Sequence, residues 1–242
     1  HRHRQQILRV DDELVRPPTP ADEQRLLAAV QTALTSADVV CLEDYAKGVL
    51  SPATCAAIIA AARRHGKPVF IDPARSPDWQ KYAGAALLTP NRAEFEIAVG
   101  RPVGEAELQA AGSETMQRFD IAALLVTLGR DGALLLRRDH PARHFPTTPR
   151  AVYDNTGAGD AVLAMFAVAV AAGASFEQAA MLANIAGGLE VSKFGCVPIT
   201  ADEVRHELQH GARRGPGKLR AAAELRGELD ARRQRGETVV FT

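Results

Sequence analysis

The residues with the clearest chemical potential form one string, DNTGAGD, which runs from Asp154 to Asp160. It stands directly before an apolar run, residues 161–172, which predicts a buried helix. Its two glycines let the backbone approach a ligand closely, and the free N–H groups of a helix start favour an anion. Asp160 would lie in the first helical turn, where it could accept a proton from an attacking hydroxyl. Acidic residues and glycines also occur at helix starts for capping alone, but the full string before a buried helix favours a functional site.

Short β-rich runs alternate with longer helical patterns around this string. The predicted strands cover residues 39–42, 68–72, 85–88 and 123–127, with a hairpin partner at 133–136 after the turn 129–132. The predicted helices cover residues 53–65, 91–99, 105–119, 161–172, 175–192 and 200–210. Such alternation predicts right-handed βαβ units, and therefore an α/β fold with a largely parallel sheet and helices on both faces.

The composition excludes several classes of protein. The chain carries 29 basic and 29 acidic residues, and this balance argues against a general nucleic-acid or membrane-surface binder. The longest apolar run, residues 161–174, is too short to span a bilayer, and no signal peptide is expected from the first residues. Three distant cysteines argue against a disulfide scaffold, so we expect a cytoplasmic protein.

Four segments, in this order along the chain, resemble motifs of the ribokinase-like (PfkB) sugar kinases. They are N-x-x-E at 91–94, VTLGRDG at 126–132, DNTGAGD at 154–160 and ANIAGG at 183–188. Further segments resemble the kinase domain of the bifunctional heptose enzymes that serve lipopolysaccharide core synthesis. These segments are residues 5–11, 44–48, 71–73 and 87–91.

The resemblance implies a ribokinase-like three-layer α/β sandwich with a mainly parallel central sheet, lacking the family's N-terminal portion. It implies a partial kinase domain over residues 1–210 and a linker, GARRGPG, over 211–217. Residues 218–242 would form a connecting helix and the first strand of a truncated nucleotidyltransferase domain.

The resemblance also implies roles for individual residues. Asp160 would be the catalytic base, and the backbone amides of Gly157, Ala158 and Gly159 would form an anion hole. The ATP-binding residues would be Asn91, Arg92, Ala93, Glu94, Thr127, Gly129 and Asn184. Glu94 would hold Mg²⁺ through water. The candidate substrate contacts are Asp44, Lys47 and Arg9.

The function implied is transfer of the γ-phosphoryl group of ATP, with Mg²⁺, to C-1 of D-glycero-β-D-manno-heptose 7-phosphate, giving the 1,7-bisphosphate for ADP-heptose synthesis. The partners would be small molecules only, the sugar phosphate and ATP, with no nucleic acid and no membrane, and the intact protein would be a homodimer. Two alternatives stay open within this reading: another PfkB-type sugar or nucleoside kinase, and a non-catalytic nucleotide-binding fragment.

Two further motifs suggest other chemistry. His206 and His210 fit the H-E-x-x-H pattern of zinc hydrolases, but the predicted helix is short and polar, and only Glu228 offers a third ligand. Histidines near a helix C-terminus are also favoured by the helix dipole, so this alternative ranks below the kinase. Residues 215–218, GPGK, resemble part of a P-loop, but Leu219 replaces the required Ser or Thr and no strand precedes them.

Overall fold

A computed structural model gives the structure of the chain and describes residues 10, 12–13, 15–147, 157–193, 195 and 197–210. The chain divides into two compact units, residues 1–204 and 205–242, and the fold below is that of the first. The predicted linker 211–217 and the segment 218–242 lie outside the described residues, as do residues 154–156 of the DNTGAGD string. No helix in the described ranges is both long and apolar enough to cross a membrane.

Within the described residues, six strands form one sheet in which spatial order follows chain order. They are β1 (Val40–Glu43), β2 (Val69–Asp72), β3 (Leu87–Leu88), β4 (Ala123–Thr127), β5 (Ala133–Arg137) and β6 (Arg143–Phe145). Strands β1 to β4 run parallel, and β5 and β6 add antiparallel at one edge. The expected α/β fold with a mainly parallel sheet is confirmed.

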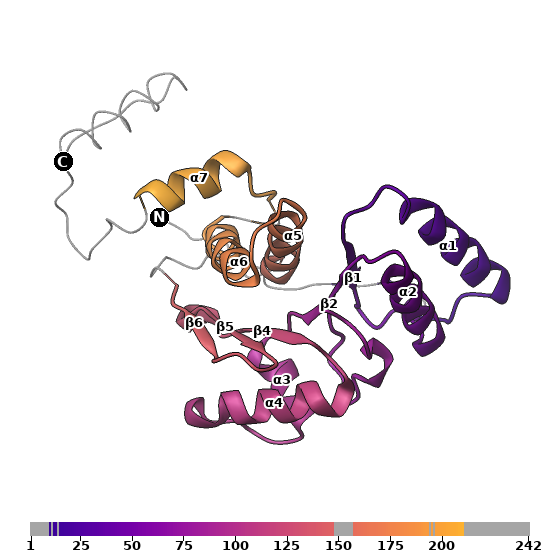
Figure 1. The fold of residues 1–242 in the computed structure, drawn as a ribbon, viewed down its shortest axis with the longest axis horizontal. Helices are drawn as coiled ribbons and strands as arrows, with labels where there is room; N and C mark the ends of the chain where they lie inside the picture. Colours follow the sequence, from indigo (N-terminus) through magenta and orange to yellow (C-terminus); the bar gives the residue numbers. More distant parts are fainter. Residues whose placement is uncertain are drawn as a thin grey trace. The chain divides into compact units, whose positions relative to one another are not determined.

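Helices cover both faces of the sheet, because its strands place successive side chains on opposite sides. On one face, Ile71, Leu88 and Leu124 pack in one cluster with the helices between the strands. On the other face, Phe70, Leu87 and Leu125 pack against the two apolar helices that come later in the chain. The first set of helices is α2 (Pro52–Arg64), α3 (Arg92–Val99) and α4 (Leu108–Phe119), and the second is α5 (Ala158–Ala171) and α6 (Phe176–Glu190). Figure 1 shows α5 and α6 on the side of the sheet opposite α3 and α4.

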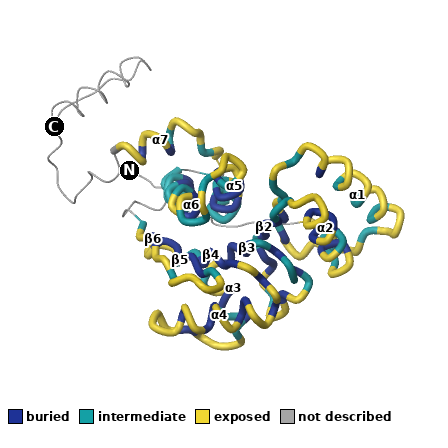
Figure 2. Tube along the Cα trace, in the orientation of Figure 1, coloured by how far each residue is buried: buried dark blue, intermediate teal, exposed yellow. Residues whose placement is uncertain are grey.

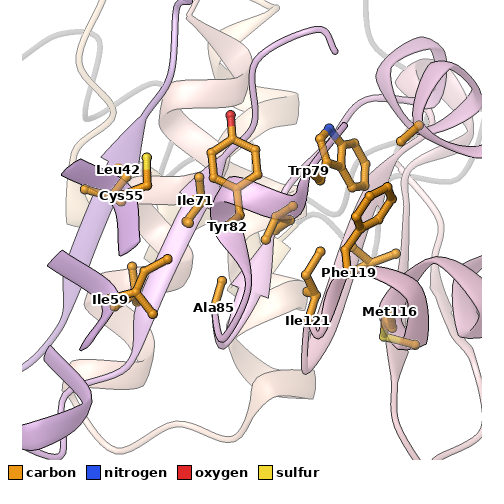
Figure 3. Close-up of a cluster of buried hydrophobic side chains, with 14 of the residues drawn as sticks. Leu42, Cys55, Ile59, Ile71, Trp79, Tyr82, Ala85, Met116, Phe119 and Ile121 are labelled. Carbon is orange, nitrogen blue, oxygen red and sulfur yellow. The ribbon is translucent and has the colours of Figure 1, made fainter. Parts of the chain in front are cut away.

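Burial is concentrated where the helices meet the sheet, as Figure 2 shows. In the close-up of Figure 3, Tyr82 and Trp79 lie among aliphatic side chains such as Ile71 and Ile121, and all four are fully buried. Tyr82 belongs to a short 3₁₀ turn, Gln80–Tyr82, that packs against α2. This packing fixes the segment that follows β2 and contributes to the site described below.

Two elements differ from the sequence-based expectation. Helix α1 (Pro20–Ala33) was not predicted, although Thr19 caps it, Pro20 occupies its first position and Asp22 completes a capping box. Strand β6 was not predicted either; it contains His144, whose Nε2 lies 2.6 Å from the carbonyl oxygen of Asp131. Residues 105–107 form a 3₁₀ turn before α4, and α7 (Ala201–His210) ends the described part of the chain.

Candidate functional site

Two parallel strands end in carboxylates at the same edge of the sheet. Glu43 is the last residue of β1 and Asp72 the last of β2, and the register pairs them directly. Helix α5 packs across both strands and brings Asp160 to the same place. Each of the three side chains offers an oxygen within 4.8 Å of the others. Ligands of open α/β sheets bind at the carboxyl ends of strands, so this carboxylate cluster (Glu43, Asp72 and Asp160) marks the candidate site.

The crowding of negative charge changes the acidity of two members of the cluster. Burial, together with repulsion from Glu43, Glu94 and Asp160, raises the pKa of Asp72 to about 8. Burial and repulsion from Asp160 raise the pKa of Glu43 to about 7. Glu94, predicted from the N-x-x-E motif, contributes to the repulsion on Asp72. A cation bound among these carboxyl groups would lower both pKa values and favour the charged forms.

The start of α5 supplies backbone N–H groups beside this cluster. Gly157 caps the helix in the left-handed conformation, with φ +91°, which a residue with a side chain rarely adopts. The first helical hydrogen bond runs from the N–H of Ala161 to the carbonyl of Gly157, 2.9 Å. The N–H groups of Ala158, Gly159 and Asp160 therefore have no acceptor within the helix. This is the arrangement that an anion-binding turn requires.

The N-x-x-E motif forms a capping box at the start of α3. The side chain of Asn91 accepts from the N–H of Glu94, 3.0 Å, and the Glu94 carboxylate accepts from the N–H of Asn91, 2.9 Å. Asn91 also forms a parallel bridge with Thr127, whose N–H donates to the carbonyl of Pro90, 2.9 Å. The structure thus brings three predicted ATP-site residues, Asn91, Glu94 and Thr127, to the ends of neighbouring strands.

The loop after β1 carries Asp44 and Lys47, the predicted substrate contacts. Asp44 is buried; Lys81 Nζ lies 2.5 Å from its Oδ2, Tyr82 donates to the same oxygen at 2.7 Å, and the N–H of Ala46 donates to Oδ1 at 2.9 Å. Burial alone would raise the pKa of Asp44, but these hydrogen bonds outweigh it and lower that pKa. Lys47 is exposed and pairs with Glu13. A substrate role stays a prediction for both residues.

The remaining predicted residues take other contacts. Arg92 donates to the carbonyl of Val103 at 2.6 Å and to Glu96 at 3.3 Å, which links α3 to the segment after it. Ala93 is exposed in the first turn of α3, and Gly129 begins a 3₁₀ turn at φ +60°. Asn184 donates to the carbonyl of Pro146 at 3.2 Å, beside the end of β6. Arg9 lies outside the described residues.

Sequence reasoning did not select Glu43, Asp72 or Tyr45 as site residues. A signal was present, because β1 and β2 each end in an acidic residue after an apolar run, and such strand ends gather at one edge of a parallel sheet. Tyr45 comes to the site through its hydroxyl, which donates to Asp160 Oδ1 at 2.8 Å. No local spacing indicates a contact between residues so far apart in the chain.

In the described ranges, three side chains that could ligate a metal come together at one place, the carboxylate cluster. An all-oxygen set suits a hard cation such as Mg²⁺, whereas structural and catalytic zinc sites include nitrogen or sulfur ligands. The zinc-hydrolase alternative rested on His206 and His210 of α7, and the side chain of His210 is not among those described. That alternative gains no support.

Comparison with known proteins gives matches along most of the chain. The model of the pfkB family carbohydrate kinases matches residues 4–202. The bifunctional protein HldE of Stutzerimonas stutzeri (strain A1501) is 43% identical over 240 residues, covering 98% of this chain and 49% of that protein. The bifunctional protein HldE of Edwardsiella ictaluri (strain 93-146) is 43% identical over 238 residues, with the same coverage. The chain spans about half the length of these curated relatives.

Solved structures with the same fold include two kinases. Phosphofructokinase-2 from Escherichia coli, in complex with potassium, superposes with a TM-score of 0.71 at 17% identity, covering 81% of this chain and 64% of that one. Ribokinase from Arabidopsis thaliana, complexed with ribose and ATP, gives a TM-score of 0.66 at 25% identity, covering 76% and 59%. The ribokinase-like fold expected from the sequence is confirmed.

Proposed function

Because the chain belongs to the pfkB family of carbohydrate kinases, we propose that it transfers the γ-phosphoryl group of ATP to C-1 of D-glycero-β-D-manno-heptose 7-phosphate. The similarity to HldE proteins over nearly the whole chain supports the heptose acceptor. The observation that carries the proposal is the convergence of Asp160, the open amides of α5 and the N-x-x-E motif at the ends of neighbouring strands.

Each group has a role that follows from its chemistry. Asp160 accepts the proton of the attacking sugar hydroxyl, which makes the oxygen a better nucleophile. The N–H groups from Gly157 to Gly159 donate toward the charge on the transferring phosphoryl group. Asn91 and Thr127 would border the triphosphate and nucleotide, and Glu94 would hold Mg²⁺ through water. Bound Mg²⁺ offsets the negative charge of the phosphate oxygens.

The carboxylates of the site fit this cation. Burial, and then mutual repulsion, raise the pKa of Asp72 and of Glu43, and a divalent ion nearby would relieve the repulsion. Oxygen ligands from carboxylates and water are those that Mg²⁺ prefers. A homodimer and a cytoplasmic location stay predictions for the intact protein.

A coupled assay of ADP release tests the proposal with the 242-residue chain, Mg·ATP and the heptose 7-phosphate. We expect turnover with the wild type and a loss of about 10²–10⁴-fold in kcat for Asp160→Asn, because general-base catalysis typically contributes that much. ATP affinity should change little. Near-normal turnover by Asp160→Asn would contradict the assignment of the base.

A matched control is Asp139→Asn. Asp139 is exposed in the turn before β6, and its φ of +58° is one that asparagine also adopts readily. It should leave kcat unchanged. Ribose and fructose 6-phosphate in the same assay test the acceptor, since faster turnover with either indicates another sugar kinase. Binding of ATP without turnover on any acceptor indicates a nucleotide-binding fragment.

A further inference from the structure

Asp160 has one neutral hydrogen-bond donor from a distant part of the chain. The hydroxyl of Tyr45, in the loop after β1, donates to Asp160 Oδ1 at 2.8 Å. A hydrogen bond to a carboxylate is stronger than one between neutral groups. The contact joins the loop to the first turn of α5, and the two residues lie 115 positions apart in the chain.

The backbone on both sides of Tyr45 is held in place. Asp44 is anchored by Lys81 and Tyr82, and the N–H of Ala46 donates back to Asp44 Oδ1 at 2.9 Å. Ala46 adopts φ +56°, a strained value for a residue with a side chain. The loop therefore has a defined shape, which directs the Tyr45 side chain toward α5.

Packing does not account for the position of this tyrosine. Tyr45 is 64% exposed, so its ring gains little from burial. Its defined interaction is the hydrogen bond to Asp160, which opposes the repulsion that Glu43 and Asp72 exert on that carboxylate. Without a donor on Oδ1, a side-chain rotation of Asp160 away from its acidic neighbours would be favoured.

We infer that Tyr45 is a positioning residue for Asp160: its hydroxyl holds Oδ1 and leaves Oδ2 to receive the proton of the sugar hydroxyl. The inference rests on the proposed function, in which Asp160 is the base. The pKa of Tyr45 is raised, chiefly by the hydrogen bond to Asp160 and to a lesser extent by burial. The phenol therefore keeps its proton and remains a donor during the reaction. Tyr45 loses no proton in the reaction. The acceptor oxygen bonds to the γ-phosphorus, its proton passes to Asp160, and ADP leaves with the electrons of the broken P–O bond.

An NMR experiment tests the contact without any need for activity. The chain has three tyrosines, so tyrosine labelled with ¹³C at Cζ gives three signals, and Tyr45→Phe identifies the one from Tyr45. At constant pH, Asp160→Ala should shift the Tyr45 signal and leave that of Tyr82 in place, because Tyr82 bonds to Asp44 instead. Asp139→Asn should move neither signal. A Tyr45 signal that ignores Asp160→Ala overturns the inference.

Kinetics test the consequence for the reaction. Tyr45→Phe removes only the hydroxyl, and it should lower kcat about tenfold while the KM for ATP and the melting temperature stay unchanged. Tyr45→Ala should lower kcat by the same factor, which would identify the hydroxyl rather than the ring as the acting group. An active wild type with an equally active Tyr45→Phe overturns this inference alone. A wild type that transfers no phosphoryl group contradicts the proposed function, and the NMR result still decides whether Tyr45 holds Asp160.

Discussion

Gly159, at the start of α5, lies directly against Asp72 at the end of β2. A β-carbon added at Gly159 would lie 3.1 Å from Asp72 Oδ2, closer than ordinary packing permits. The lack of a side chain at this position therefore allows the helix start to close on the strand end. The same closeness brings Asp160, the next residue, within reach of the carboxylates of β1 and β2.

Gly159→Ala should separate helix stability from site geometry. Gly159 does not have a positive φ, and alanine favours a helix over glycine by about 1 kcal/mol, so the melting temperature should hold or rise. The added methyl group must displace Asp72 by a few tenths of an ångström. We expect kcat to fall by about tenfold, because small misplacements of reacting groups are costly. Thermal melting and the ADP assay check both parts, and unchanged kcat would mean that the close approach has no role in the reaction.

The raised pKa values in the cluster predict a stability that falls as pH rises. The folded protein keeps protons on Asp72 up to a pKa of about 8 and on Glu43 up to about 7, whereas in the unfolded chain both titrate near pH 4. Protons bound more tightly by the folded state stabilise it at low pH, and this stabilisation is lost as pH rises through the folded pKa values. The contribution of these two groups should therefore decline between about pH 4 and pH 8.

Glu43→Gln provides the test of that pH dependence. It removes one charge, so repulsion on Asp72 weakens, and the melting temperature should fall less between pH 5 and pH 8.5 than in the wild type. Glu105→Gln, at an exposed position in the 3₁₀ turn before α4, serves as the control and should follow the wild-type curve. Parallel curves for all three proteins would show that the cluster does not titrate in this range.

The elements with clear start and stop signals could be predicted from the sequence. Ser51 caps α2 and Pro52 opens it, one residue before the predicted range, Ser175 caps α6, and β4 has the predicted bounds. Helix α1 carries an equally good start at Thr19, but none of its residues is buried, so packing adds little to its capping signal. Local capping signals alone were not enough where packing contributes little.

The site residues also fall into two groups: those that local sequence indicates, and those that only the fold brings together. Asp160 lies in a local string whose composition indicates chemistry, and Glu94 was selected through the resemblance of N-x-x-E to a family motif; both site roles stay predictions. Glu43 and Asp72 meet only because β1 and β2 pair in parallel with one particular register, and that register is a property of the whole sheet. The bond between Tyr45 and Asp160 depends in addition on how α5 crosses the strands. Neither relationship is contained in any single segment.

The buried hydroxyl of Tyr82 should stabilise the loop after β1. It donates to Asp44 at 2.7 Å and accepts from the N–H of Ala74 at 2.9 Å, and its residue is fully buried. Tyr82→Phe leaves both partners short of a bond, and we expect a loss of about 1–3 kcal/mol in the free energy of unfolding. Urea denaturation measures it. Tyr45→Phe, which removes an exposed hydroxyl, is the matched control, and an equal loss in both variants would contradict this account.

Two substitutions of Glu94 should separate its role in metal binding from its role in helix capping. Its carboxylate accepts from the N–H of Asn91, and glutamine can fill the same place in a capping box. Glu94→Gln should therefore keep the melting temperature but weaken Mg·ATP binding in calorimetry by about tenfold, because the negative charge is lost. Glu94→Ala should weaken binding similarly and also cost about 1 kcal/mol of stability.

Removal of the metal completes this comparison. With EDTA, the wild type should bind ATP more weakly than Glu94→Gln does with Mg²⁺ present, because removal of the metal also leaves the phosphate charge unneutralised. The variant should lose less affinity on addition of EDTA than the wild type does, because its contact with the metal is already lost. If Glu94→Gln binds Mg·ATP as tightly as the wild type, Glu94 acts through the capping box alone, and the metal must be held by other oxygens of the site.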